Sequence, residues 1–123
     1  KKRMVRVQMY LNQYKQGGTA VLEYVFDAVI ELGPHDTPQT LRRMLDDGYR
    51  QRLAGFVDEY NEAAKSLGAV PSELPRGFLL TNLRHTPMLD GVPLRQQGVG
   101  DGDTLRALPL SASQCDDAFR DST

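Results

Sequence analysis

Two stretches near the start of the chain alternate between apolar and polar residues. One runs from Met4 to Leu11 and the other from Ala20 to Leu32, with the turn-prone pair Gly17 and Gly18 between them. A period of two residues is typical of a strand with one buried face, so the pattern predicts two long antiparallel strands that form a hairpin. In the second strand, the apolar residues expected on one face are Leu22, Tyr24, Phe26, Ala28 and Ile30.

Apolar residues then recur at helical spacing from Pro38 to Leu67. Thr37 can accept a hydrogen bond from a free backbone N–H, Pro38 suits the first helical position, and Gly68 suits the residue after the last turn. A continuous helix over this range would be about 45 Å long, from the helical rise per residue. Residues 46–48 read Asp-Asp-Gly and have weak helix propensity, so we expect either one bent helix or two helical pieces that meet there.

The second half of the chain has the pattern of further strands and turns. Residues 78–80 form a short apolar run and residues 104–110 alternate again, so each range is expected to form a strand. Two Asp-Gly dipeptides between these ranges are typical of turns. We expect a single domain over residues 1–110, followed by a flexible polar tail over residues 111–123.

The order strand, strand, helix, strand, turn, strand is that of the β-grasp, an α+β fold in which a mixed sheet packs on a helix. Residues 89–94 read Leu-Asp-Gly-Val-Pro-Leu, and residues 98–105 read Gly-Val-Gly-Asp-Gly-Asp-Thr-Leu. Together with the strand-to-helix junction over residues 29–41, these blocks resemble the ubiquitin-like family. Their sequence motifs are most similar to those of the bacterial ubiquitin-like domains associated with type VII secretion. In this fold Leu94 and Val99 are expected to cap the core. The chain departs from ubiquitin in its extended first hairpin and its unusually long or broken helix.

The resemblance implies two alternative functions. The first is a non-catalytic module that binds other proteins, as a component of a bacterial secretion or ubiquitin-like system. The second is a ubiquitin-like modifier precursor that is processed at its C-terminus and conjugated to targets. Modifiers of this fold end in a flexible Gly-Gly, whereas Pro109 to Ser113 stand in that place here. The sequence therefore favours the binding module.

Composition and charge exclude several classes of partner. With 15 Lys and Arg against 16 Asp and Glu, the net charge is −1, so the chain has no basic excess for a nucleic-acid backbone or an anionic membrane. No run of about 18 apolar residues is present, which predicts no membrane span. The single cysteine, Cys115, cannot form an intramolecular disulfide, and we expect a cytoplasmic protein. The oligomeric state is left open.

The sequence holds no recognisable catalytic or metal-binding arrangement. Cys115 stands beside two aspartates, whose negative charge disfavours a thiolate nucleophile. His35 and His85 lie far apart in predicted loops, and a zinc site needs three or four ligands. Asp101 and Asp103 supply too few oxygen ligands for a calcium loop, and their run reads as a turn. We therefore expect no enzyme activity, no cofactor and no metal.

Two surfaces are candidates for binding a protein partner. A sheet of this size covers about the first three or four turns of the predicted helix, so Phe56, Val57 and Tyr60 need another cover. That cover is either the extended hairpin or a partner, since an apolar patch left exposed usually marks an interface. The second candidate is the outer face of the sheet, where we expect Leu79 and Leu108, although single surface leucines are also common.

Overall fold

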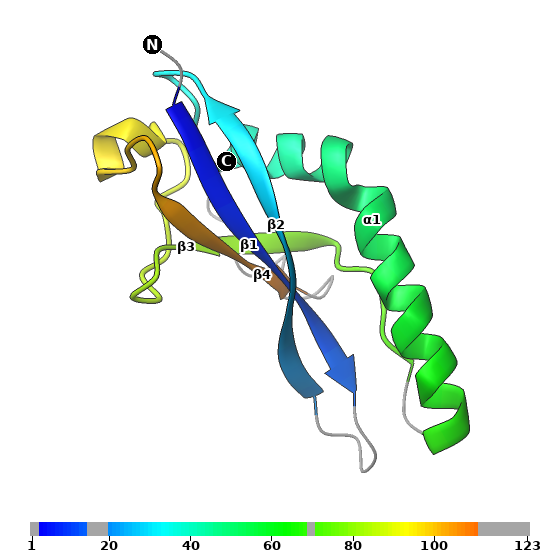
Figure 1. The fold of residues 1–123 in the computed structure, drawn as a ribbon. Coiled ribbons are helices and arrows are strands. Elements are labelled where there is room, and N and C mark those ends of the chain that lie inside the picture. Colours follow the sequence, from blue (N-terminus) through cyan, green and yellow to red (C-terminus); the bar gives the residue numbers. More distant parts are fainter. Residues whose placement is uncertain (1–2, 15–19, 69–70, 111–123) are drawn as a thin grey trace.

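A computed structural model of the chain describes residues 3–14, 20–68 and 71–110. Its elements are β1 (Arg3–Tyr14), β2 (Ala20–Leu32), α1 (Pro38–Leu67), β3 (Gly77–Thr81), the short 3-10 helix η1 (Leu94–Gln97) and β4 (Thr104–Leu110). The strands form one sheet in the order β2-β1-β4-β3, in which β1 and β4 are parallel and the outer pairs are antiparallel. α1 crosses one face of this sheet (Figure 1). This arrangement is the predicted α+β fold, a β-grasp.

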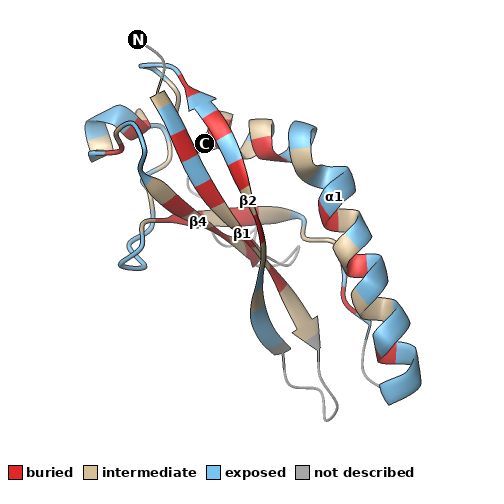
Figure 2. Ribbon diagram, viewed as in Figure 1, coloured by how far each residue is buried: buried red, intermediate tan, exposed pale blue. Residues whose placement is uncertain are grey.

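The core lies between the sheet and α1, and β1 is at its centre (Figure 2). Every second residue from Val5 to Leu11 of β1 is buried, namely Val5, Val7, Met9 and Leu11. These side chains belong to a cluster that also contains Leu41 and Leu45 from the start of α1 and Leu105 and Ala107 from β4. The alternation seen in the sequence therefore arises because one face of each strand packs on the helix and the other does not.

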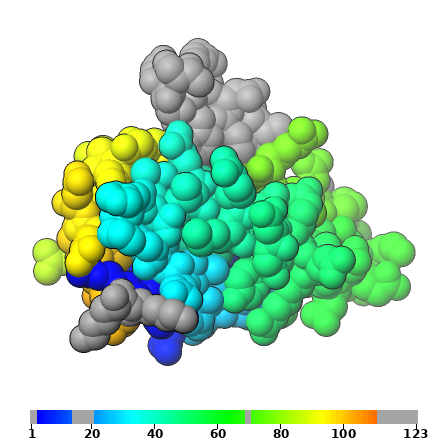
Figure 3. All heavy atoms as spheres, turned by 90° about the horizontal axis from the view of Figure 1, so that it is seen from above, coloured from blue at the N-terminus to red at the C-terminus, as the bar shows by residue number. Residues whose placement is uncertain are grey.

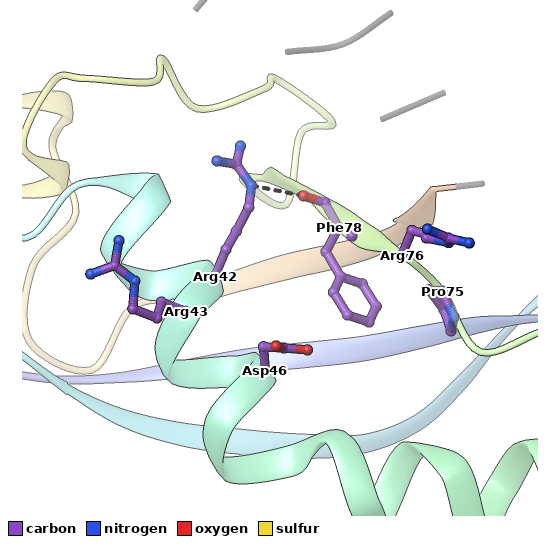
Figure 4. A pocket seen from close by; sticks show the side chains of 7 residues that line it. Arg42, Arg43, Asp46, Pro75, Arg76 and Phe78 are labelled. Carbon is purple, nitrogen blue, oxygen red and sulfur yellow. Dashed lines mark hydrogen bonds between the residues drawn. The ribbon is translucent and has the colours of Figure 1, made fainter. Parts of the chain in front are cut away.

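Both ends of α1 are capped as predicted. The Thr37 hydroxyl oxygen accepts from the backbone N–H of Thr40 at 3.4 Å, and the Thr40 hydroxyl oxygen accepts from the backbone N–H of Thr37 at 2.8 Å. Gly68 closes the last turn in the left-handed conformation, with φ of 66°, which glycine adopts without strain. α1 is one helix of 30 residues rather than two pieces, and it changes direction just beyond Asp46 (Figure 4). The expected bend is therefore present.

A β-bulge changes which residues of β2 face the core. Met9 pairs with Phe26 and Tyr10 pairs with Tyr24, so Val25 is an extra residue on β2. Beyond the bulge the alternation reverses, which leaves Leu22 and Tyr24 on the outer face with exposed fractions of 51% and 47%. The prediction that these two residues share a face with Phe26 is wrong, because a single inserted residue exchanges the two faces of a strand.

The outer half of the hairpin packs on the second half of α1. Leu11, Leu53 and Val57 are all at most 6% exposed and belong to one cluster. The Phe26 ring stacks on Phe56 with their centroids 5.8 Å apart. The sequence left open whether the extended hairpin or a partner covers this part of α1. In the structure the hairpin covers it.

The turns before β4 attach to the rest of the fold through backbone hydrogen bonds. The Leu94 N–H donates to the Asp36 carbonyl at 2.8 Å, and the Gly102 N–H donates to the Met4 carbonyl at 2.8 Å. Figure 3 shows the segment around η1, coloured yellow, beside the end of β2 and the start of α1. Leu94 is fully buried and Val99 is 6% exposed, which confirms that they cap the core.

Replacing Leu53 by alanine tests whether the hairpin and α1 form one cooperative core. Removing this buried side chain should lower the free energy of unfolding by about 2–5 kcal/mol, because a cavity replaces close packing. Urea unfolding followed by circular dichroism measures the change. The matched control is Leu67→Ala at the end of the same helix, where Leu67 is 55% exposed, and it should alter stability by less than about 0.5 kcal/mol. Equal effects of both substitutions would contradict the packing described.

Candidate interaction surfaces

The three helix residues proposed from the sequence as partner contacts lie beneath the hairpin. Val57 is buried, while Phe56 and Tyr60 are half-buried at the margin of the core. A partner could reach Val57 only by displacing the hairpin, so this part of α1 presents no open apolar patch. The role of these residues in partner binding stays a prediction, and their observed contacts are those of packing.

Tyr60 has an unusual electrostatic environment. Burial raises the pKa of its hydroxyl to about 12, and the neighbouring Glu23 carboxylate contributes in the same direction. Glu23 faces Tyr60 because the bulge reverses the alternation of β2, so its position could not be read from the period-two pattern. Deprotonation would place a second negative charge in this partly covered site, which explains why the neutral phenol is favoured.

Asn61 holds the chain that returns from α1 toward the sheet. Its side-chain amide donates to the Ser72 carbonyl at 3.0 Å, and its side-chain oxygen accepts from the Ser72 N–H at 2.6 Å. Ser72 is 7% exposed, so both of its backbone groups are satisfied away from water. Sequence reasoning missed this pair, because a polar residue on a helix carries no signal of a partner eleven positions away.

The outer face of the sheet carries an apolar group in one half. Leu79 and Leu108 are cross-strand partners on β3 and β4, and both side chains are half-buried. Tyr10 and Tyr24 form the neighbouring pair on β1 and β2, with ring centroids 5.8 Å apart. Leu22 extends this group toward the end of the hairpin. We call these five residues the outer apolar patch, and two of them, Leu79 and Leu108, were expected on this face.

The other half of the outer face carries charged and polar side chains around exposed apolar ones such as Val29. The Arg6 Nε lies 3.7 Å from an Asp27 carboxylate oxygen, and the Arg106 Nε donates to the Gln8 side-chain oxygen at 3.2 Å. The Arg6 side chain is 60% exposed, so this ion pair contributes little to stability. The outer face therefore joins an apolar patch to a charged one, which is the composition of many protein interfaces.

The residues weighed for metal or nucleophilic chemistry have structural partners or lie apart. Among the described residues, no group of three His, Cys, Asp or Glu side chains could hold a metal ion. Asp101 and Asp103 instead accept backbone N–H groups from Met4 and Gly100 at 2.8 and 2.6 Å. Cys115 and the expected flexible tail lie outside the described residues. No helix in the described ranges is long and apolar enough to cross a membrane.

No protein-family model and no curated protein matches the chain. Among solved structures, the chain is similar to a domain described as the EccD5 ubiquitin-like domain from Mycobacterium xenopi, with 20% sequence identity. The alignment covers 90% of this chain and 97% of that domain, at a TM-score of 0.43. The strand order and pairing by themselves define a ubiquitin-like fold.

The raised pKa of Tyr60 predicts a loss of stability in alkali. The ordinary pKa of tyrosine is 10.0 and that of Tyr60 is about 12, so the stabilising contribution is complete below pH 10 and is lost between pH 10 and pH 12. Tyr60→Phe cannot ionise, so its free energy of unfolding should fall less over that interval. Urea unfolding at a series of pH values measures both proteins, and parallel curves would contradict the prediction.

Proposed function

We propose that this chain is a non-catalytic ubiquitin-like module that binds a protein partner through the outer face of its sheet. The observation that carries the proposal is the outer apolar patch, in which Leu79 pairs with Leu108 and Tyr10 pairs with Tyr24 across neighbouring strands. α1 covers the opposite face of the sheet, so within the described residues the outer face is the side that no helix covers.

The composition of the patch supports protein recognition. Tyrosine rings offer a large apolar area with few rotamers to immobilise, and the Tyr24 ring is held in place by a hydrogen bond that its hydroxyl donates to Asp27. Tyr24 is 47% exposed and Leu22 is 51% exposed, so much apolar surface remains for a partner to remove from water. Arg6 and Arg106, in the adjoining polar half, would set orientation and association rate more than affinity.

We propose the assembly and the cellular compartment of this module from its sequence. The sequence of residues 98–105 resembles that of bacterial ubiquitin-like domains associated with type VII secretion. We therefore propose that the chain works in a bacterial secretion or ubiquitin-like assembly. The net charge of −1 argues against nucleic acid as the partner. The single cysteine accords with a reducing compartment, and we propose the cytoplasm.

Substituting both leucines of the patch tests the proposed interface. The variant Leu79→Asp/Leu108→Asp should lose partner capture by about tenfold or more, because central apolar contacts dominate interface energies. The measurement is affinity capture from cells that naturally produce the protein, with intact mass determined for the full chain and its companion. A stoichiometric, non-covalent companion is the expected result for the unsubstituted chain.

The matched control is Val29→Asp, on the same face but opposite Arg6 in the polar half, where Val29 is 51% exposed. This variant should keep its partner and its thermal midpoint. Capture that survives the double substitution would refute the interface, and loss of folding would show that the two leucines are core residues. Covalent adducts on a shortened chain would instead support the modifier alternative.

A further inference from the structure

A pocket of about 300 Å³ lies between the first half of α1 and the start of β3. Its side chains come from α1, with Arg42, Arg43 and Asp46, and from the chain that enters β3, with Pro75, Arg76 and Phe78 (Figure 4). Phe78 is buried toward α1, whereas the adjacent Leu79 belongs to the outer apolar patch. The pocket is therefore separate from the interface proposed above.

Arg42 connects the elements that surround this pocket. Its Nε donates to the Phe78 carbonyl at 2.9 Å, and its Nη2 lies 2.8 Å from an Asp90 carboxylate oxygen. The Arg42 and Asp90 side chains are 16% and 18% exposed, so the ion pair is well shielded from water. Arg42 thus joins α1, β3 and the turn at Asp90, and its charge is already compensated.

Two positive charges at the pocket remain uncompensated. The one carboxylate in the lining belongs to Asp46, and its charge is paired with that of Arg50 at 2.9 Å. Arg43 and Arg76 are both exposed, and within residues 3–14, 20–68 and 71–110 neither guanidinium has an ion pair or a hydrogen bond. The region therefore carries a local excess of two positive charges on a chain whose net charge is −1.

The floor of the pocket is apolar. The Phe78 ring points between β3 and α1 and is 7% exposed, and the half-buried Pro75 ring lies beside it (Figure 4). A site with an apolar floor and guanidinium groups at its margin suits a ligand with an apolar side chain next to carboxylates. Figure 4 shows Arg43 on the α1 side of the pocket and Arg76 on the side of the chain that leads into β3.

We infer that this pocket binds an acidic peptide segment of a protein partner, with one apolar side chain on Phe78 and flanking carboxylates on Arg43 and Arg76. An extended peptide places successive side chains several ångströms apart, which matches guanidinium groups on the two sides of the pocket. This second site is independent of the outer apolar patch, and a partner could engage either or both.

The experiment measures binding of a fluorescent acidic peptide, Gly-Glu-Asp-Leu-Glu-Asp-Gly with blocked ends, to the full chain by fluorescence anisotropy. Arg43→Gln and Arg76→Gln should each weaken binding by about threefold to tenfold, and raising NaCl from about 0.05 M to about 0.5 M should weaken it further. Arg84→Gln, at an exposed arginine away from the pocket, is the matched control and should bind like the unsubstituted chain.

Two further peptides examine the chemistry of the ligand. A version with all carboxylates replaced by carboxamides should not bind, and a version with serine in place of leucine should bind about tenfold more weakly. Absence of binding by the acidic peptide, or equal binding by the Arg43→Gln/Arg76→Gln chain, would overturn the inference. Inorganic phosphate that displaces the peptide at equal concentration would show a compact-anion site instead. Leu79→Asp/Leu108→Asp should leave peptide binding unchanged, which separates this site from the proposed interface.

Discussion

The packing of the β1–β2 hairpin on the second half of α1 is the constraint on which the rest of the structure depends. A helix of 30 residues extends beyond the sheet of a small β-grasp, and its apolar stripe continues to Val57 and Ala64. One extra residue at Val25 reverses the faces of β2, so that Glu23 faces this stripe beside its cross-strand partner Leu11 of β1. Without the bulge, the hairpin would direct Leu22 and Tyr24 toward α1 instead, and Glu23 toward water.

The bulge also determines where apolar surface remains. The hairpin covers the apolar stripe of α1, while the same reversal moves Tyr24 and Leu22 to the outer face beside Tyr10. The β2 part of the outer apolar patch, Leu22 and Tyr24, therefore depends on the bulge, whereas its other residues follow the regular alternation of β1, β3 and β4. A ubiquitin-like fold with an enlarged helix therefore keeps an apolar group on the outer face of its sheet.

The ion pair between Arg42 and Asp90 has a comparable organising role on the helix side. The pair joins α1 to the turn at Asp90, and the Arg42 Nε separately donates to the Phe78 carbonyl on the edge strand β3. Because Arg42 is committed to this structural role, Arg43 and Arg76 are left as the free cations of the pocket. The two proposed sites thus lie on opposite faces of β3, one apolar and one cationic.

The sequence by itself determined the local elements. The alternation in β1 and β4, the Thr37 cap, the Gly68 terminus, the bend after Asp46 and the buried Leu94 and Val99 all follow from patterns a few residues long. Tertiary structure decided what those patterns leave open. The bulge at Val25, the Asn61 clamp on Ser72 and the pocket between α1 and β3 each depend on segments distant in the chain. The periodicity of a sequence indicates which face of a helix or strand is apolar. Which other element covers that face depends on tertiary packing.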